Sequence, residues 1–141
     1  MSMEIHVLSD KKLPSASAWQ NAIEAEGYDL VLDPEAEFDL MNGFMPATLR
    51  GAPSGFEGYH DDVQEVMEAY ADMPYFQSCP AWSHVLSLRW GGVFHEALSA
   101  CMAAVAYAKA TGGVIYEPQA GRALTLDEAR ELVHEFETLA R

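Results

Sequence analysis

The sequence predicts one α+β domain over residues 1–141, with a mixed and largely antiparallel sheet of about five to six strands and about four helices packed against it. Three observations predict this class. Strand and helix patterns alternate towards both ends of the chain, two neighbouring strand patterns indicate a hairpin in the middle, and one helical pattern is apolar around almost its whole circumference. Half of the residues are apolar, which is enough to build a sizeable core.

The first part of the chain has the patterns of a strand, a helix and a second strand. Ser15 or Ser17 can cap the helix, and Gly27 suits the left-handed position after its last turn. Pro34 stops the second strand, and an acidic loop follows it. The expected ranges are 4–10 for the first strand, 13–27 for the helix and 28–34 for the second strand.

The middle of the chain predicts a hairpin followed by a helix. Strand patterns over residues 43–51 and 54–60 flank a loop of a few residues, Ala-Pro-Ser at 52–54. Pro46 cannot donate to a ladder, so its strand is expected to be an edge strand or to carry a bulge. A helix is expected over 61–72, with Asp61 or Asp62 at its N-terminus.

The last part of the chain predicts a central strand, a buried helix, a short strand and a surface helix. In the first of these two helices, small and apolar residues occupy almost the whole circumference, which is typical of a buried helix. Thr125 and Glu128 form the capping box of the second helix. The expected ranges are 83–90 and 114–118 for the strands, 93–110 and 125–141 for the helices, and 119–123 for a turn.

The net charge of −14 is unevenly placed, because residues 13–88 hold thirteen acids against Arg50 alone. Such a surface repels phosphate backbones, so we expect no nucleic-acid partner. It attracts a basic protein partner, or it serves solubility without any partner. Under the first alternative, the acidic face comprises Glu24, Glu26, Glu35, Glu37, Glu57, Asp61 and Asp62.

The sequence lacks the signals of a membrane or secreted protein. No apolar run reaches the roughly 18 residues of a membrane span, and the N-terminal segment lacks the order of a secretory signal. We therefore expect a cytoplasmic protein without membrane contact. Cys79 and Cys101 have no CxxC spacing and are expected to be free thiols.

The segment Arg89–Trp90–Gly91–Gly92 is a candidate ligand-binding corner, because a strand, two glycines and a helix can cradle an anion with backbone N–H groups. The specific nucleotide-binding motifs are absent, so no cofactor is expected. We favour the simpler interpretation, a joint between strand and helix in which the glycines provide positive φ or close packing.

The helix after this corner carries His95, Glu96 and Ser99, the only catalytic candidates that the sequence offers. His95 and Ser99 lie four residues apart on one helix face, which permits a Ser/His pair. However, a serine inside a helix lacks the exposed elbow of a nucleophile, and no orienting acid is identifiable. We therefore interpret these three residues as the polar stripe of a buried helix.

The segment "GFEGYHDD" places Glu57, His60, Asp61 and Asp62 together, a set that could suit a divalent cation. Its spacing does not match a calcium loop, and no second histidine is near. Helix capping by Asp61 or Asp62 explains these acids more simply, so we predict no metal.

Five parts of the chain form a familiar pattern: "LPSASAWQNAI", "LDP", "GFMPATLRG" followed by "SGFEGYH", "LRWGG" and "AYAKATGGVIYEPQAG". Together they resemble a family of small uncharacterised bacterial proteins that carry no assigned activity. The last of these, Ala106 to Gly121, also resembles the close of bacterial domains associated with toxin immunity. The resemblance implies no functional residues.

Three functions remain as hypotheses. The first is a non-enzymatic acidic module that binds a protein, such as an immunity-type inhibitor of a basic effector, through residues 13–88. The second is a small-molecule-binding protein or an enzyme at the Gly91–Gly92 corner. The third is a homo-oligomeric structural protein that associates through an edge strand near Pro46 or through an exposed aromatic patch.

Overall fold

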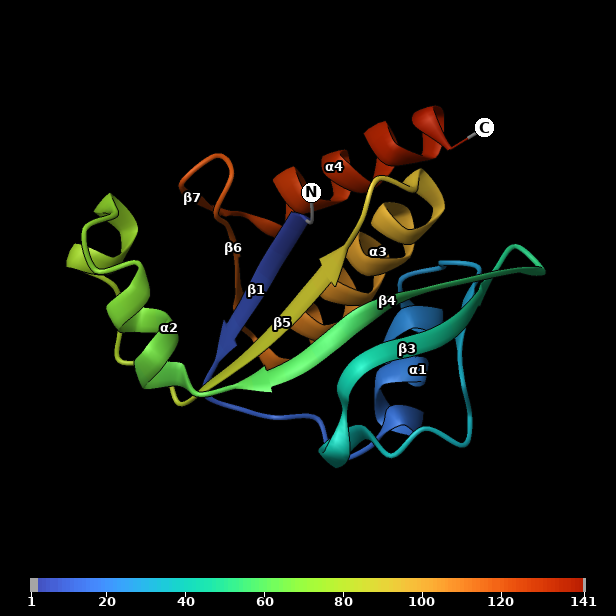
Figure 1. Cartoon of the computed structure of the whole chain (residues 1–141), viewed down its shortest axis with the longest axis horizontal. Coiled ribbons are helices and arrows are strands. Elements are labelled where there is room, and N and C mark those ends of the chain that lie inside the picture. Colours follow the sequence, from blue (N-terminus) through green and yellow to red (C-terminus); the bar gives the residue numbers. More distant parts are fainter. Residues whose placement is uncertain (1–2, 141) are drawn as a thin grey trace.

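The computed structural model describes residues 3–140 and contains one seven-stranded sheet in the order β2-β3-β4-β5-β1-β6-β7 (Figure 1). Every pair of neighbouring strands is antiparallel. The predicted α+β class is confirmed, with one strand more than the upper expectation. The strands are β1 (Met3–Ser9), β2 (Leu30–Leu32), β3 (Asn42–Leu49), β4 (Ala52–Asp61), β5 (His84–Trp90), β6 (Val114–Glu117) and β7 (Arg122–Leu124).

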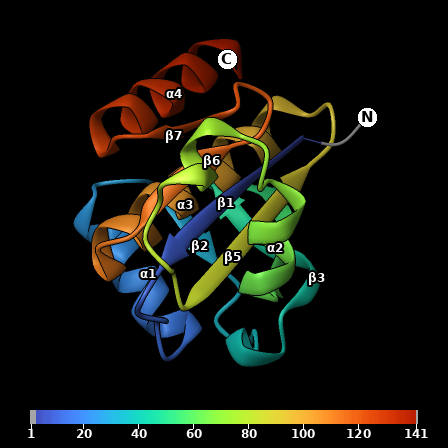
Figure 2. The same cartoon turned by 90° about the vertical axis from the view of Figure 1, so that its left-hand side faces the viewer.

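Three of the four α-helices cover one face of the sheet, and the fourth lies on the other face (Figures 1 and 2). The first face is covered by α1 (Ala16–Ala25), α3 (Phe94–Thr111) and α4 (Leu126–Leu139). The second face carries α2 (Val63–Ala69) and the 3₁₀ helix η2 (Pro74–Gln77). Another 3₁₀ helix, η1 (Phe38–Leu40), precedes β3.

Helix starts follow the predicted caps. The Ser15 hydroxyl accepts a hydrogen bond from the backbone N–H of Ala18, and the Asp62 carboxylate accepts one from that of Glu65. Both bonds of the capping box between Thr125 and Glu128 are formed. These caps satisfy donors that the first helical turn leaves without partners, so they locate the helix starts from local sequence.

The main core lies between α1, α3 and the sheet, with Trp19 at its centre. Its indole ring is fully buried and contacts the rings of Phe38, Phe56 and Tyr107 at centroid distances of 5.4 to 5.9 Å. Its ring N–H donates to the backbone carbonyl of Ala103 at 3.0 Å. The small residues of α3 allow this close approach, as the sequence predicts.

The hairpin turn is shorter than expected. The predicted loop, residues 52–54, is wrong, because Ala52 and Pro53 already pair with β3. The turn consists of Arg50 and Gly51, whose φ values are 52° and 79°. Two consecutive residues with positive φ match the twist of a hairpin, which explains how a two-residue connection suffices.

A second turn is also shorter than expected. The predicted turn over residues 119–123 is wrong in its second half, because Arg122 and Ala123 pair with β6. Gly121, with a φ of 66°, closes the turn through a hydrogen bond from its N–H to the Glu117 carbonyl at 2.9 Å. The shorter turn accounts for the additional strand, β7.

At Pro46, β3 is not an edge strand and carries no bulge, contrary to the prediction, although its residues 42–45 have a neighbouring strand on one side only. β3 pairs with β4 along its whole length, but β2 pairs only with residues Ala47–Leu49. The Pro46 carbonyl accepts a hydrogen bond from the N–H of Asp33, one residue beyond the end of β2, at 3.1 Å. Pro46 has no N–H to donate to the neighbouring strand. Because it lies just past the residues that pair with β2, the absence of this hydrogen bond costs little stability.

Candidate functional site

The second face of the sheet is covered over only half its width. α2 and η2 pack over the strands β1, β5 and β6, where they enclose a small core of Leu8, Val66, Val85 and Tyr116. No helix of residues 3–140 lies in front of β3 and β4 on this face (Figure 1). We call this part of the sheet the uncovered face; its residues are Asn42, Phe44, Pro46 and Thr48 of β3, Glu57, Tyr59 and Asp61 of β4, and Arg89 of β5.

Strand alternation explains why polar and aromatic residues gather there. Phe56 points to the helix-covered face, where it contacts Trp19, so its neighbour Glu57 points to the opposite face. Glu57 lies opposite Phe44 of β3 on one side and opposite Arg89 of β5 on the other. Residues from three strands therefore meet on one rigid surface.

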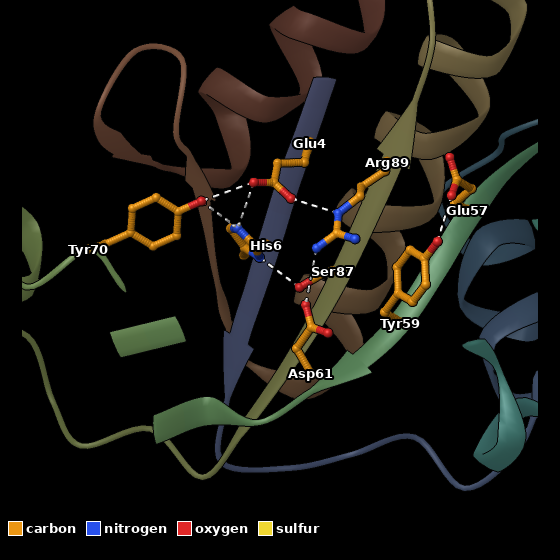
Figure 3. Close-up of polar contacts among 8 residues, drawn as sticks. All are labelled: Glu4, His6, Glu57, Tyr59, Asp61, Tyr70, Ser87 and Arg89. Atoms are coloured by element: carbon orange, nitrogen blue, oxygen red, sulfur yellow. Dashed lines mark hydrogen bonds and ion pairs between the residues drawn. The ribbon is translucent and has the colours of Figure 1, made fainter. Parts of the chain in front are cut away.

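A polar network marks the border between the covered and uncovered halves (Figure 3). The Glu4 carboxylate accepts hydrogen bonds from Nε of Arg89 at 2.8 Å and from the Tyr70 hydroxyl at 3.0 Å. The Arg89 guanidinium also lies 3.7 Å from the Asp61 carboxylate. One cation is thus shared by two acids, and Tyr70 attaches α2 to the sheet.

His6 lies beneath this network and is only 2% exposed. Its Nδ1 is 2.7 Å from the Ser87 hydroxyl, and its Nε2 is 3.2 Å from the Tyr70 hydroxyl. Because Tyr70 donates its proton to Glu4, it must accept from Nε2–H of His6, and Nδ1 must accept from Ser87. The hydrogen-bond pattern is complete with a neutral imidazole.

The environment shifts the pKa values of both titratable groups downward. Burial lowers the pKa of His6, because it penalises the charged imidazolium more than the nearby Glu4 charge favours it. Burial alone would raise the pKa of Glu4, but the hydrogen bonds from Arg89 and Tyr70 reverse this effect and lower it. At neutral pH the network therefore consists of a neutral His6, an ionised Glu4 and a cationic Arg89.

Arg89 connects the network to the uncovered face. Its guanidinium lies over the Tyr59 ring, 4.6 Å from the ring centroid, and the Tyr59 hydroxyl donates to the Glu57 carboxylate at 2.5 Å. These contacts hold an aromatic ring and two acids in fixed positions at the surface. The arrangement is suited to binding, because its reactive groups lie inside: Ser87 and His6 are almost fully buried.

The Gly91–Gly92 corner is the expected joint, since β5 ends at Trp90 and α3 begins at Phe94. The reason proposed for the two glycines is wrong, however. Neither has a positive φ, and a Cβ on either would meet no atom within 4 Å. The Trp90 side chain is buried against Phe136, so it is not displayed at the corner.

Alanine is therefore expected to be tolerated at Gly91 and Gly92, within about 0.5 kcal/mol of the wild-type free energy of unfolding. Gly55→Ala should cost about 1 to 3 kcal/mol, because φ is 146° there. An added Cβ would also lie 2.5 Å from the Phe44 ring. Denaturant titrations of the three variants measure the difference, and equal losses at Gly55 and Gly91 would contradict it.

The catalytic candidates do not form the pair that their spacing permits. The Ser99 hydroxyl is fully buried and donates to the backbone carbonyl of His95 at 2.8 Å, while Ser54 lies at 2.8 Å on its other side. The His95 imidazole is exposed, and no hydrogen bond joins it to Ser99 within residues 3–140. Glu96 is partly exposed in the first turn of α3.

The acidic residues expected to share one face are divided between two. Glu57 and Asp61 lie on the uncovered face, whereas Glu24 lies on α1 and Glu26 directly follows that helix, on the opposite side of the sheet. Glu26 is also engaged by Arg130 at 2.9 Å. Glu35 and Glu37 lie on the exposed loop between β2 and β3, and Asp62 caps α2.

Within residues 3–140, no group of three or more His, Cys, Asp or Glu side chains is arranged to hold a metal ion. His60, one of the proposed ligands, instead places Nε2 2.8 Å from the Phe38 carbonyl. No helix in this part of the chain is long and apolar enough to cross a bilayer.

Four residues of the polar network have no place among the sequence-based candidates. They are Glu4, His6, Tyr70 and Ser87. A signal existed in β1 and β5, where Glu4 and His6, and likewise Ser87 and Arg89, occupy alternate positions between apolar residues. That alternation indicates two polar strand faces, but their pairing depends on the sheet order.

Comparisons of the chain with protein-family models, with curated proteins and with solved structures found no match.

Proposed function

We propose that the protein is a non-enzymatic binding module that docks a basic partner protein on its uncovered face. The observation that carries this proposal is the exposed aromatic and acidic surface of β3 and β4. Phe44 is 59% exposed on β3, which is unusual for a ring of this size. Aromatic anchors beside fixed charges are typical of interfaces.

The charge of the protein supports a basic partner. Near Phe44, the acids Glu57 and Asp61 lie on the same face, and Arg89, the cation between them, is already shared by Glu4 and Asp61. The chain carries a net charge of −14, so its field attracts cations from a distance. An immunity-type inhibitor that covers a basic effector is one protein of this kind, and the resemblance of residues 106–121 favours it.

The proposal also accounts for the position of the polar network. His6 and Ser87 are too buried to reach a substrate, but they fix β1, β5 and α2 relative to one another. A fixed network lowers the entropy lost when a partner binds, because the surface groups are already ordered. In the proposed function, the polar network holds Arg89 and Tyr59 in the positions that the partner contacts.

The test begins with capture of basic proteins from a cell lysate at low salt, followed by calorimetric titration of each purified candidate. Phe44→Ala should weaken binding at least tenfold, since it removes the central apolar contact. Glu57→Gln should weaken binding less and should reduce its dependence on salt. Circular dichroism confirms that each variant is folded.

Two matched variants on α4 serve as controls. Leu139→Ala removes an apolar side chain that is 54% exposed, and Glu135→Gln removes an exposed acid. Neither should change the affinity. If the α4 variants weaken binding and the Phe44 and Glu57 variants do not, the partner docks elsewhere and the proposed surface is wrong.

A further inference from the structure

β3 extends beyond its neighbour and leaves part of one edge open. β2 pairs only with Ala47–Leu49, and the last bond on that side joins Asp33 to Pro46. After Asp33 the chain turns away, as the bond from Ala36 N–H to the Asp33 carbonyl shows, and it returns at η1. Residues 42–45 therefore have a strand on one side only, β4.

The open edge presents backbone groups that can pair with another strand. Pro46 directs its carbonyl towards β2, so alternation directs the N–H and C=O groups of Phe44 and Asn42 to the same side. No turn, loop or side chain of residues 3–140 hydrogen-bonds to these groups. Unpaired strand edges are templates for strand addition unless the protein covers or charges them.

A groove of about 340 Å³ runs beside this edge. Its rim includes Leu40 and Phe44, which are 73% and 59% exposed. Asp33 and Glu37 contribute carboxylates to the lining, and no Lys or Arg lines it. The groove thus combines an unpaired backbone edge, apolar side chains and negative charge.

We propose that an extended segment of the basic partner adds as a strand beside Asn42 and Phe44 of β3. Main-chain hydrogen bonds would supply affinity, and alternate side chains would contact Phe44 on one face and the acidic loop on the other. This inference rests on the proposed function and specifies its mode of binding. Phe44 belongs to both surfaces, so one partner can contact the uncovered face and the edge together.

A basic segment fits this edge better than a second copy of the chain. Two copies paired through β3 would bring the carboxylates Asp33 and Glu37 of each close to those of the other. Like charges opposed in this way are unfavourable. Lysine or arginine side chains of an added segment would be attracted by the same carboxylates.

The experiment uses a synthetic twelve-residue peptide of alternating lysine and valine as the probe. Hydrogen exchange of the 141-residue chain is followed by NMR at each backbone amide, with peptide up to millimolar concentration. Exchange at Asn42 and Phe44 should slow at least tenfold. The control is the same peptide N-methylated at every second residue, which removes the N–H donors along one of its edges. When this edge faces β3, the peptide should not slow exchange at Asn42 and Phe44.

Charge-reversal variants provide the matched comparison. Glu37→Lys, at an exposed position in the groove, should weaken peptide binding at least fivefold. Glu135→Lys makes the same charge change on α4 and should have less effect. Equal effects would mean that only net charge matters, and would overturn the inference.

Two further outcomes would overturn strand addition, and they have different consequences for the proposed function. Resonance shifts at Glu57 and Tyr59 without protection at Asn42 and Phe44 would leave docking on the uncovered face intact. Absence of binding up to millimolar peptide would overturn strand addition alone, since the partner titrations test the face independently. Protection without peptide, together with dimers in sedimentation, would assign the edge to a second copy.

Discussion

Trp19→Ala is expected to lower the free energy of unfolding by about 3 to 5 kcal/mol, because it empties the centre of the main core. The indole contacts Phe38, Phe56 and Tyr107, which belong to η1, β4 and α3. The substitution therefore removes contacts to several elements at once. It also leaves the Ala103 carbonyl without the indole donor.

Denaturant titration monitored by circular dichroism measures this loss. Trp82→Ala is the control, since Trp82 is only partly buried, beside Tyr75 on the second face. Trp82→Ala should lower the free energy of unfolding by clearly less than Trp19→Ala does. If both variants lose the same free energy of unfolding, the two cores contribute equally to stability. That result would contradict the prediction, which rests on the deeper burial of Trp19.

His6→Leu is expected to cost about 1 to 3 kcal/mol at pH 8, because it leaves the buried Ser87 hydroxyl without its partner. The cost should also depend on pH. Burial keeps the pKa of His6 below its usual value, so the unfolded chain takes up the proton first as the pH falls. Below about pH 6.5, the unfolded state therefore holds more protons and wild-type stability decreases.

The leucine variant lacks this titration, so the difference in stability between wild type and His6→Leu should narrow between pH 8 and pH 5. His60, whose pKa burial also lowers, contributes equally to both proteins and cancels. His95→Leu is the control, because it makes the same substitution at a side chain that is exposed on α3. If the stability difference between wild type and His6→Leu stays constant over this pH range, burial does not disfavour the charged form of His6, and the prediction is wrong.

Local signals in the sequence were sufficient for most elements of the fold. Ser15, Asp62 and Thr125 cap helices where their side chains can satisfy free N–H groups, and such caps need no tertiary context. The error in the hairpin turn arose because Arg50 adopts positive φ, which is uncommon outside glycine. Ala52–Ser54 therefore appeared to be a loop although it continues a strand.

The functional region was harder to predict because it depends on long-range pairing. Glu4 and Arg89 are 85 residues apart, and they meet only because β1 lies beside β5. The charge pattern identified Glu57 and Asp61 but could not show that Glu24 and Glu26 lie across the sheet from them. The number of acids follows from composition, whereas their distribution between two faces follows from sheet order.

The place of β1 in the sheet also affects when the chain can fold during synthesis. β1 is the first strand made, yet both of its neighbours, β5 and β6, come late and are linked by α3. Until residue 117 leaves the ribosome, β1 lacks its second neighbour, and its apolar side chains Ile5, Val7 and Leu8 stay without their native cover. The nascent chain thus carries an aggregation-prone strand through most of translation, and we expect its yield to depend on chaperones that hold N-terminal segments.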